Sequence, residues 1–372
     1  MSNTNMASDF NLTKLSTKDL SENIRATIEI GGNITIIGRR GSGKTYIAKD
    51  VIKQSGHKEV YWNLSTFERT DTAGYPNFFG AQQGEKYISF LLPQSFKLLI
   101  EGNEPVVLLL DEVDKADASL WASLLELVQF RTINGRPLPN LRAVIMTGNL
   151  QAEGGQRPSL PLLDRAEKYI VEASHHHWLD WAAKSGRIHP SITAYVSDHP
   201  EDLFGDVDPG DVYADPSPRG WDNASKILHF GEEKKWAHKI LTNKVAGCIG
   251  KKTGIKYAAY FDHYQVLLPI VERIMKGEEI NGFGGLEQSK QMVTSMIVCS
   301  RLSRVIDEMK PNHKDFPKET HNVAKFLKGV DPEMSLISVR SQIGLERVVN
   351  SGLDELPLFD QLLRDIAKRI NC

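Results

Sequence analysis

The sequence predicts an α/β fold in its first half, with a parallel sheet covered by helices, and a mostly α-helical second half. Up to about residue 171, short apolar runs alternate with segments of helical periodicity. Such alternation is typical of a parallel sheet with crossover helices. Beyond Trp221, apolar residues recur at helical spacing as far as the C-terminus, which predicts helices there.

The elements of the first half can be placed along the chain. The expected strands are the apolar runs Ile34 to Ile37, Val60 to Leu64, Val106 to Leu110 and Ala143 to Met146. Helical periodicity is clearest from Tyr46 to Ile52 and from Leu120 to Val128. Between the last helix and the last strand, Asn134-Gly135 predicts a tight hairpin.

Composition suggests where the chain divides. Residues 1–22 are rich in Ser, Thr and Asn and are expected to form a flexible arm. We expect the α/β core at 23–195, because a stretch dense in Pro, Asp and Gly between Gly186 and Arg219 favours a linker. A linker and helical lid are expected at 196–265, and a C-terminal helical region at 266–372.

The overall composition excludes several classes of protein. The 372 residues are 41% hydrophobic and 25% charged, which is ordinary for a globular protein of two or three units. The formal net charge of -2 argues against a global field that attracts nucleic acid or an anionic membrane. The 3 cysteines form no CxxC pair, so a disulfide framework is not expected. Without a long apolar run or a secretory signal, we expect a cytoplasmic protein.

The strongest motif is the glycine-rich loop GRRGSGKT, which follows the first expected strand and precedes a helix. Its glycines let backbone N–H groups turn toward phosphate, and the helix N-terminus adds favourable charge. Lys44 would reach the β- and γ-phosphates, and the Thr45 hydroxyl would bind Mg2+. A chance glycine-rich turn is the weaker alternative. The predicted ATP-binding residues are Gly38, Arg39, Arg40, Gly41, Ser42, Gly43, Lys44, Thr45, Tyr46 and Asp111.

A pair of acids, Asp111 and Glu112, follows the aliphatic run that starts at Val106. At the end of a buried strand, Asp111 would join Thr45 in holding Mg2+, and Glu112 would be the base that polarises attacking water. The pair could instead begin a solvated helix, since Asp117-Ala118-Ser119 resembles a helix cap. The aliphatic run directly before the acids favours the buried strand.

Together these motifs resemble the AAA+ ATPases, and among them the MoxR-like group. The loop GRRGSGKT and the strand LLLDEVDKA are similar to the two nucleotide motifs of that group, and LLELVQFRTINGRPLPN is similar to its helix and hairpin. MTGN resembles the sensor strand, while PLLDR and PSPRG resemble two arginine motifs. The resemblance covers about residues 24 to 265 and implies an AAA+ P-loop core followed by a helical lid.

The resemblance implies a role for each of several polar residues. Asn149 would be the sensor that positions water, and Arg165 the arginine finger that reaches the nucleotide of a neighbouring subunit. Arg219 would be the second sensor, carried on the helical lid. Asn63 would restrain the catalytic glutamate until a partner binds.

The chain departs from the family pattern near the finger. Ala166 follows Arg165 where relatives usually have an aromatic residue, and no proline follows Asn149. Arg157 is a rival for the finger, and a surface arginine or a local carboxylate pair is the alternative for each arginine. A finger that acts between subunits implies a homo-oligomeric ring, most simply a hexamer.

The segment between the second and third expected strands, Ser65 to Glu104, is about 40 residues long, more than one crossover helix needs. It contains Tyr75, Phe78 and Phe79, which are flanked by glycines. Our hypothesis is that these aromatic residues form a loop at the ring axis that grips a client. The alternative is that they pack into the core of their own domain.

The leading functional hypothesis is therefore a Mg2+-dependent ATPase that remodels or activates a protein client. A nucleic-acid motor or loader and an ATP-switched assembly scaffold are the alternatives. His175-His176-His177 is a poor metal motif, because three consecutive residues do not face one ion. The sequence lacks a full DxSxS motif near Asp19 or Asp117, so a von Willebrand A-type partner would be a separate chain.

Overall fold

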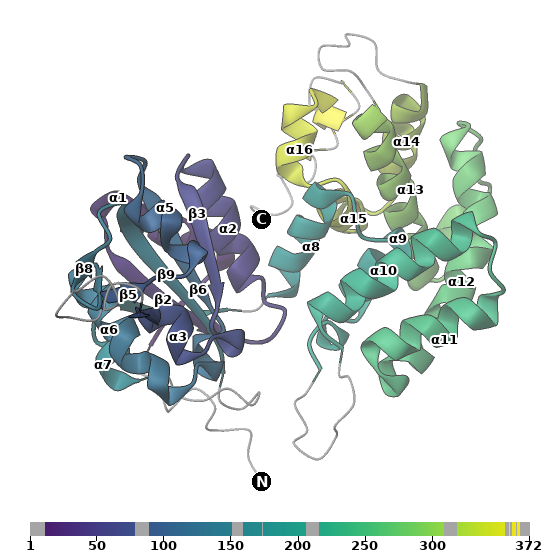
Figure 1. Cartoon of the computed structure of the whole chain (residues 1–372). Helices are drawn as coiled ribbons and strands as arrows, with labels where there is room; N and C mark the ends of the chain where they lie inside the picture. Colours follow the sequence, from purple (N-terminus) through teal and green to yellow (C-terminus); the bar gives the residue numbers. More distant parts are fainter. Residues whose placement is uncertain are drawn as a thin grey trace. The chain divides into compact units, whose positions relative to one another are not determined.

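The computed structural model describes residues 12–78, 89–150, 159–172, 174–205, 216–308, 318–353, 357, 359–361 and 363–364. The chain divides into two compact units, Met1–Ala173 and Ser174–Cys372 (Figure 1). The first unit is an α/β structure, and the described part of the second unit is helical. Both halves of the predicted fold class are thereby confirmed.

A six-stranded parallel sheet forms the centre of the first unit, with the strand order β1-β10-β2-β9-β6-β3. Its strands are β1 (Thr13–Leu15), β2 (Asn33–Gly38), β3 (Lys58–Asn63), β6 (Val106–Asp111), β9 (Leu141–Asn149) and β10 (Glu167–Val171). Because all pairs are parallel, the strands end at one common edge. In register, Gly38 lies beside Asn149, and Asn63 lies beside Asp111.

Helices cover both faces of this sheet (Figure 1). Helices α1 (Thr17–Ile30) and α2 (Lys44–Gln54) pack on one face, against Val107 and Leu109 of β6. Helices α5 (Lys97–Ile100), α6 (Trp121–Phe130) and α7 (Leu160–Leu163) pack on the other face, against Leu108 and Leu110. A strand that is buried on both sides needs a continuous apolar run, which explains the sequence of β6.

The prediction of a flexible arm at residues 1–22 is wrong from Thr13 onward. Strand β1 extends the sheet beside β10, and Ser16 caps α1 by accepting a hydrogen bond from the backbone N–H of Asp19. Leu20 and Ile24 of α1 are buried in the core. Their spacing of four residues continues past residue 22, so the polar composition concealed an amphipathic helix. Residues 1–11 lie outside the described residues.

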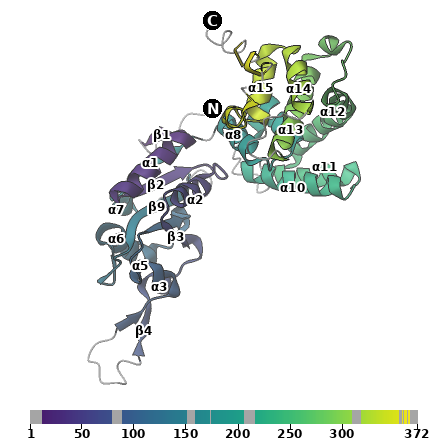
Figure 2. The same cartoon turned by 90° about the horizontal axis from the view of Figure 1, so that it is seen from above.

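An extra segment between β3 and β6 is confirmed. It contains η1 (Leu64–Thr66), α3 (Arg69–Ala73), η2 (Gln94–Phe96) and an antiparallel pair, β4 (Tyr75–Asn77) with β5 (Ser89–Leu91). In Figure 2 this β4–β5 hairpin projects away from the rest of the first unit.

The hairpin predicted at Asn134-Gly135 is also confirmed. Strand β7 (Thr132–Ile133) pairs with β8 (Arg136–Pro137), and both turn residues have positive φ, 48° and 70°. Asparagine and glycine are the residues that such a turn favours. The Glu126 carboxylate of α6 accepts hydrogen bonds from the backbone N–H groups of Asn134 and Gly135, at 3.0 and 2.8 Å.

The helices of the second unit share one hydrophobic core. They are α8 (His175–Ser185), α9 (Pro190–Asp198), α10 (Pro218–Glu233), α11 (His238–Ile249), α12 (Lys251–Met275), α13 (Gln288–Glu308), α14 (Lys318–Lys328), α15 (Pro332–Gln342) and α16 (Leu345–Asn350), with the short turns η6 (Pro200–Asp202) and η7 (Phe283–Gly285). None of the described helices is long and apolar enough to cross a membrane.

The structural boundary differs from the expected ones. The two units meet between residues 173 and 174, whereas the expected boundaries at 195/196 and 265/266 fall inside α9 and α12. Helices α8 and α9 contribute Trp178, Leu179, Ile192 and Val196 to the core of the second unit. The Pro- and Asp-rich stretch between Gly186 and Arg219 that suggested a boundary therefore contains α9 and lies within the second unit.

Candidate functional site

The glycine-rich loop joins the end of β2 to the start of α2, as predicted. Gly41 and Gly43 have φ of 71° and 85°, in the left-handed region that L side chains rarely adopt. At Gly38 a Cβ atom would approach Ser42 Oγ to 3.3 Å and Val171 Cγ1 to 3.2 Å. The backbone of the loop thus favours glycine at Gly41 and Gly43, while a Cβ at Gly38 would require the neighbouring side chains to shift by a few tenths of an ångström.

Lys44 lies at the first position of α2, and only 7% of it is exposed. Its Nζ donates hydrogen bonds to the backbone oxygens of Gly38 and Arg39, at 2.9 and 2.8 Å, and lies 3.3 Å from Asn149 Oδ1. All three of these acceptors are uncharged oxygen atoms. The lysine is therefore anchored inside the loop, at the N-terminus of a helix, where an anion is favoured.

The Ser42 hydroxyl tests whether the loop fits a phosphate group. Its Oγ is buried and has no hydrogen-bond partner among the described residues. An unsatisfied buried hydroxyl is costly, and each such group in a native structure calls for an explanation. A phosphate oxygen is an acceptor that would satisfy it, so the loop fits a phosphate chain.

Asp111 ends β6 and accepts several hydrogen bonds. Its Oδ1 accepts from the Thr45 hydroxyl at 3.0 Å, from the backbone N–H of Glu112 at 3.0 Å and from the Thr147 hydroxyl. Its Oδ2 accepts from the Tyr61 hydroxyl at 3.0 Å. Carboxylate and hydroxyl oxygens are the ligands that Mg2+ prefers. The structure thus brings the two predicted metal ligands together, and they fit that ion.

Tyr61 was not among the predicted site residues. Partial burial, followed by the hydrogen bond to Asp111 and the negative charges of Asp111, Glu112 and Glu59, raises the pKa of Tyr61 to about 12. The phenol therefore stays protonated at neutral pH and donates to the Asp111 carboxylate.

Glu112 has a left-handed backbone, with φ 56° and ψ 42°. Such a conformation costs a non-glycine residue on the order of 1–2 kcal/mol and is found mostly at functional sites. The carboxylate is partly exposed and lies 3.0 Å from Lys115 Nζ. This turn, which starts η3 (Val113–Lys115), leaves the Glu112 side chain accessible to water beside the proposed phosphate site.

Asn149 ends β9 and is held from two sides. Its Oδ1 contacts Lys44, while its backbone N–H and its Nδ2 donate to the two oxygens of Asp114, at 2.9 and 3.3 Å. Asp114 is only 1% exposed, and sequence reasoning did not identify it. The predicted sensor position therefore lies between the phosphate loop and the segment that carries the acid pair.

Other predicted residues lie near the loop without a described role. Arg39 is half-buried, and Arg40 and Tyr46 are exposed. Asn63 lies beside Asp111 in register, but its Oδ1 accepts from the backbone N–H and the hydroxyl of Ser65, at 3.1 and 2.8 Å. In this structure Asn63 caps η1, and its restraining role stays a prediction.

The predicted finger lies at the opposite edge of the sheet from the loop. Arg165 is two residues before Glu167, which pairs with Ile34 near the start of β2, whereas the loop follows the end of β2. Its Nε donates to Gln129 Oε1 and its NH1 to the Pro161 backbone oxygen, both at 2.6 Å. Arg157 lies outside the described residues. Arg219 is exposed at the start of α10, in the second unit.

The β4–β5 hairpin exposes apolar side chains. Tyr75 is 54% and Phe78 is 63% exposed, so packing into the core is wrong for these two residues. Phe90 and Leu91 of β5 are exposed as well. Phe79, the third aromatic residue of the hypothesis, lies outside the described residues.

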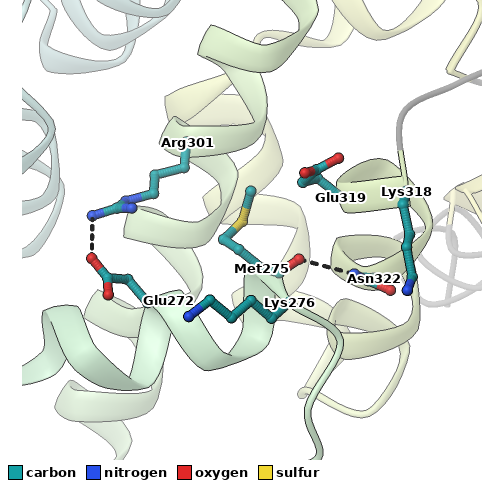
Figure 3. Close-up of a pocket in the computed structure, with 7 residues that line it drawn as sticks. All are labelled: Glu272, Met275, Lys276, Arg301, Lys318, Glu319 and Asn322. Atoms are coloured by element: carbon teal, nitrogen blue, oxygen red, sulfur yellow. Dashed lines mark hydrogen bonds and ion pairs between the residues drawn. The ribbon is translucent and has the colours of Figure 1, made fainter.

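The second unit contains a pocket of about 440 Å³ between α12, α13 and α14. Figure 3 shows the ion pair of Arg301 with Glu272, at 3.8 Å, and the hydrogen bond from Asn322 to the Met275 backbone oxygen. The pocket is lined by both cationic and acidic side chains. Within the described ranges, no group of three or more His, Cys, Asp or Glu residues is placed to hold a metal ion. The side chains with recognisable chemistry are those at the sheet edge of the first unit.

Comparison with known families agrees with this geometry. Residues 34–170 match the model of the ATPase family associated with various cellular activities (AAA). No curated protein matches the chain. The matched residues run from β2 to β10 and include the loop, the acid pair and Asn149. Over residues 34–170 the first unit is therefore similar to the AAA ATPase family, whose domains bind ATP and use its hydrolysis.

Proposed function

We propose that this protein is a Mg2+-dependent ATPase of the MoxR-like AAA+ group, which works as a ring and remodels or activates a protein client. One observation carries the enzymatic part of the proposal. At the carboxyl edge of the sheet, Lys44 lies within hydrogen-bonding distance of Asn149, and Thr45 lies within hydrogen-bonding distance of Asp111. A triphosphate with its metal ion needs such a set of groups.

Each residue has a defined task in binding. The backbone of the loop and the Lys44 ammonium would hold the β- and γ-phosphates of ATP, and the Ser42 hydroxyl would find its acceptor there. Thr45 and Asp111 would hold Mg2+, which when bound neutralises negative charge on the phosphate oxygens.

Glu112 and Asn149 have the tasks that belong to hydrolysis. The Glu112 carboxylate would accept a proton from the attacking water while the water oxygen bonds to the γ-phosphorus atom. The bond from that phosphorus to the bridging β-phosphate oxygen then breaks, and ADP is the leaving group. The Lys115 ammonium lies 3.0 Å from the Glu112 carboxylate and forms an ion pair with it. Asn149 is fixed by Asp114, so its amide is oriented before substrate arrives and helps to position the water.

The position of Arg165 supports a ring. Because it lies at the opposite edge of the sheet from Lys44, it would serve the nucleotide of a neighbouring subunit rather than its own. A guanidinium at that place stabilises the charge that spreads over the transferring phosphoryl group. The rate of hydrolysis rises by a factor on the order of 10³ as a result. The bonds to Gln129 and Pro161 would hold Arg165 near the surface of the unit. We propose a hexamer as the simplest closed arrangement.

The β4–β5 hairpin supports contact with a protein client. Exposed apolar groups on a projecting element often mark a surface that binds another protein. Tyr75 and Phe78 would grip an unfolded or flexible segment of the client. A separate von Willebrand A-type chain is the alternative partner for the same surface.

The experiment that tests the enzymatic part compares two variants with the wild type. Lys44→Ala should lose ATP binding, whereas Glu112→Gln should bind ATP and lose about 10²- to 10⁴-fold in phosphate release. Equal turnover by Glu112→Gln and wild type would contradict the role of the base. If Arg165 acts between subunits, a mixture of Arg165→Ala and Lys44→Ala chains should recover part of the activity.

The client part needs a different readout. Phe78→Ala should leave basal ATP hydrolysis and folding unchanged but should abolish stimulation by a protein client. Stimulation by single- or double-stranded DNA would replace the protein client with a nucleic acid. ATP-dependent assembly with negligible phosphate release would favour an assembly scaffold.

A further inference from the structure

Neither the match to the AAA family nor the predicted motifs explain the position of Tyr61. It lies on β3, two residues before Asn63, and it is 40% exposed. A tyrosine at that degree of exposure needs no partner in the protein, since water would serve its hydroxyl. Instead the hydroxyl donates to Asp111 Oδ2 at 3.0 Å.

The ring of Tyr61 also has a partner. The Nζ of Lys49 lies 3.9 Å from the ring centroid, a cation–π contact, and 3.5 Å from Glu59 Oε1. Lys49 is on α2, one helical turn after Thr45. The same helix therefore contacts both members of the pair, Asp111 through Thr45 and Tyr61 through Lys49.

The two carboxylate oxygens of Asp111 consequently differ. Oδ2 accepts a hydrogen bond from Tyr61, while Oδ1 accepts from the Thr45 hydroxyl and the Glu112 backbone N–H, both at 3.0 Å, and from the Thr147 hydroxyl. Free rotation about the last bond of the aspartate would exchange the two oxygens. The bond from Tyr61 to Oδ2 opposes that exchange, together with the bonds that Oδ1 accepts.

We propose that Tyr61 is a positioning residue for the metal-binding carboxylate: it holds Asp111 Oδ2 and so presents Oδ1, together with the Thr45 hydroxyl, to Mg2+. The inference rests on the proposed function, since it assigns a second partner to the same metal site. Groups that orient a metal ligand typically contribute 10- to 100-fold to metal affinity. Removing only the hydroxyl tests the idea, because Tyr61→Phe keeps the ring beneath Lys49.

The measurement is the affinity of the full-length chain for fluorescent ADP, first in EDTA and then at rising Mg2+ concentrations. By linkage, the gain in nucleotide affinity that Mg2+ produces equals the gain in Mg2+ affinity that the nucleotide produces. In EDTA, Tyr61→Phe should bind ADP with the affinity of the wild type. In Mg2+, its gain in ADP affinity should be about tenfold smaller than that of the wild type. Thr45→Ala, which removes a ligand itself, should lose the gain as well.

Tyr260→Phe is the matched control, since it removes a comparable bond, from Tyr260 to Asp198 Oδ2 at 3.2 Å, in the second unit. It should retain the whole gain. If Mg2+ raised the ADP affinity of Tyr61→Phe as much as that of the wild type, the inference about Tyr61 would be overturned, and the ATPase proposal would stand. An equal loss in EDTA and in Mg2+ would show a merely structural role and overturn it too. A wild-type chain that binds no ADP would remove both proposals.

Discussion

The contact between Asp114 and Asn149 gives the sharpest test of the site, because its effect can be estimated from two hydrogen bonds. The Asp114 carboxylate accepts from the Asn149 backbone N–H at 2.9 Å and from its Nδ2 at 3.3 Å. A hydrogen bond to a charged group is worth about 1.5–3 kcal/mol, and the longer bond contributes less. The substitution also removes the cost of burying the Asp114 carboxylate, which offsets part of this loss. We therefore expect Asp114→Ala to lower the free energy of unfolding by about 2 kcal/mol.

That loss should lower the melting temperature of the first unit by about 4–8 °C, given a unit of its size. Calorimetry measures the shift, and the transition of the first unit is the one that moves upward when ATP is added. Nucleotide binding should persist, since Lys44 keeps its bonds to Gly38 and Arg39. Turnover should fall because Asn149 is no longer held.

Asp117→Ala is the control for Asp114→Ala. Asp117 lies three residues further along, is fully exposed and caps η4 (Ala118–Leu120) by accepting from the Ser119 N–H at 2.8 Å. It should shift the melting temperature much less and leave turnover unchanged. If Asp114→Ala melted within 1 °C of the wild type, Asp114 would not hold Asn149 in solution, and the argument for a prearranged sensor would fail.

Three further predictions follow from other parts of the chain. Gly74→Ala should loosen the β4–β5 hairpin, because φ is 82° and a Cβ would lie 2.7 Å from the Leu91 backbone oxygen; hydrogen exchange of β5 should quicken while ATP binding is kept. The alkaline absorbance titration of the wild type minus that of Tyr61→Phe should have a midpoint near pH 12. Because folding raises the pKa of Tyr61, its phenol contributes fully to stability below pH 10, the ordinary tyrosine pKa. That contribution is lost as the pH rises to about 12. A titration midpoint near pH 10 would disprove the bond to Asp111. Cys299 is buried, and burial raises the pKa of its thiol, so Ellman's reagent should react with it only after unfolding.

Much of the first unit could be predicted because its signals are local. The loop glycines, the aliphatic run before Asp111 and the Asn134-Gly135 turn each depend on a few adjacent residues. These signals placed Lys44 and Thr45 at the helix start that follows one strand, and Asp111 at the end of another. Asn149 was found through the family resemblance, and parallel pairing brings these strand ends to one edge.

The residues that were missed depend on contacts between distant segments. Tyr61 reaches Asp111 across 50 residues of sequence, and Thr147 reaches it across 36. Nothing near Tyr61 in the sequence distinguishes it from any other aromatic residue of a strand. Asp114 was overlooked for a different reason: an acid in a polar turn is usually exposed, and only the packing of η3 against β9 buries it.

A continuous set of contacts joins the acid pair to the exposed hairpin, and this bears on how ATP hydrolysis would be used. The chain passes from Glu112 through η3 and η4 into α6, whose Glu126 carboxylate holds the turn at Asn134. Asn134 Nδ2 in turn donates to the backbone oxygen of Ala73, two residues before β4 begins. Hydrogen bonds to a carboxylate are strong and directional, so a displacement of α6 moves the turn and the base of the hairpin together. The element that would grip a client is therefore connected, within a single unit, to the segment proposed to act in ATP hydrolysis.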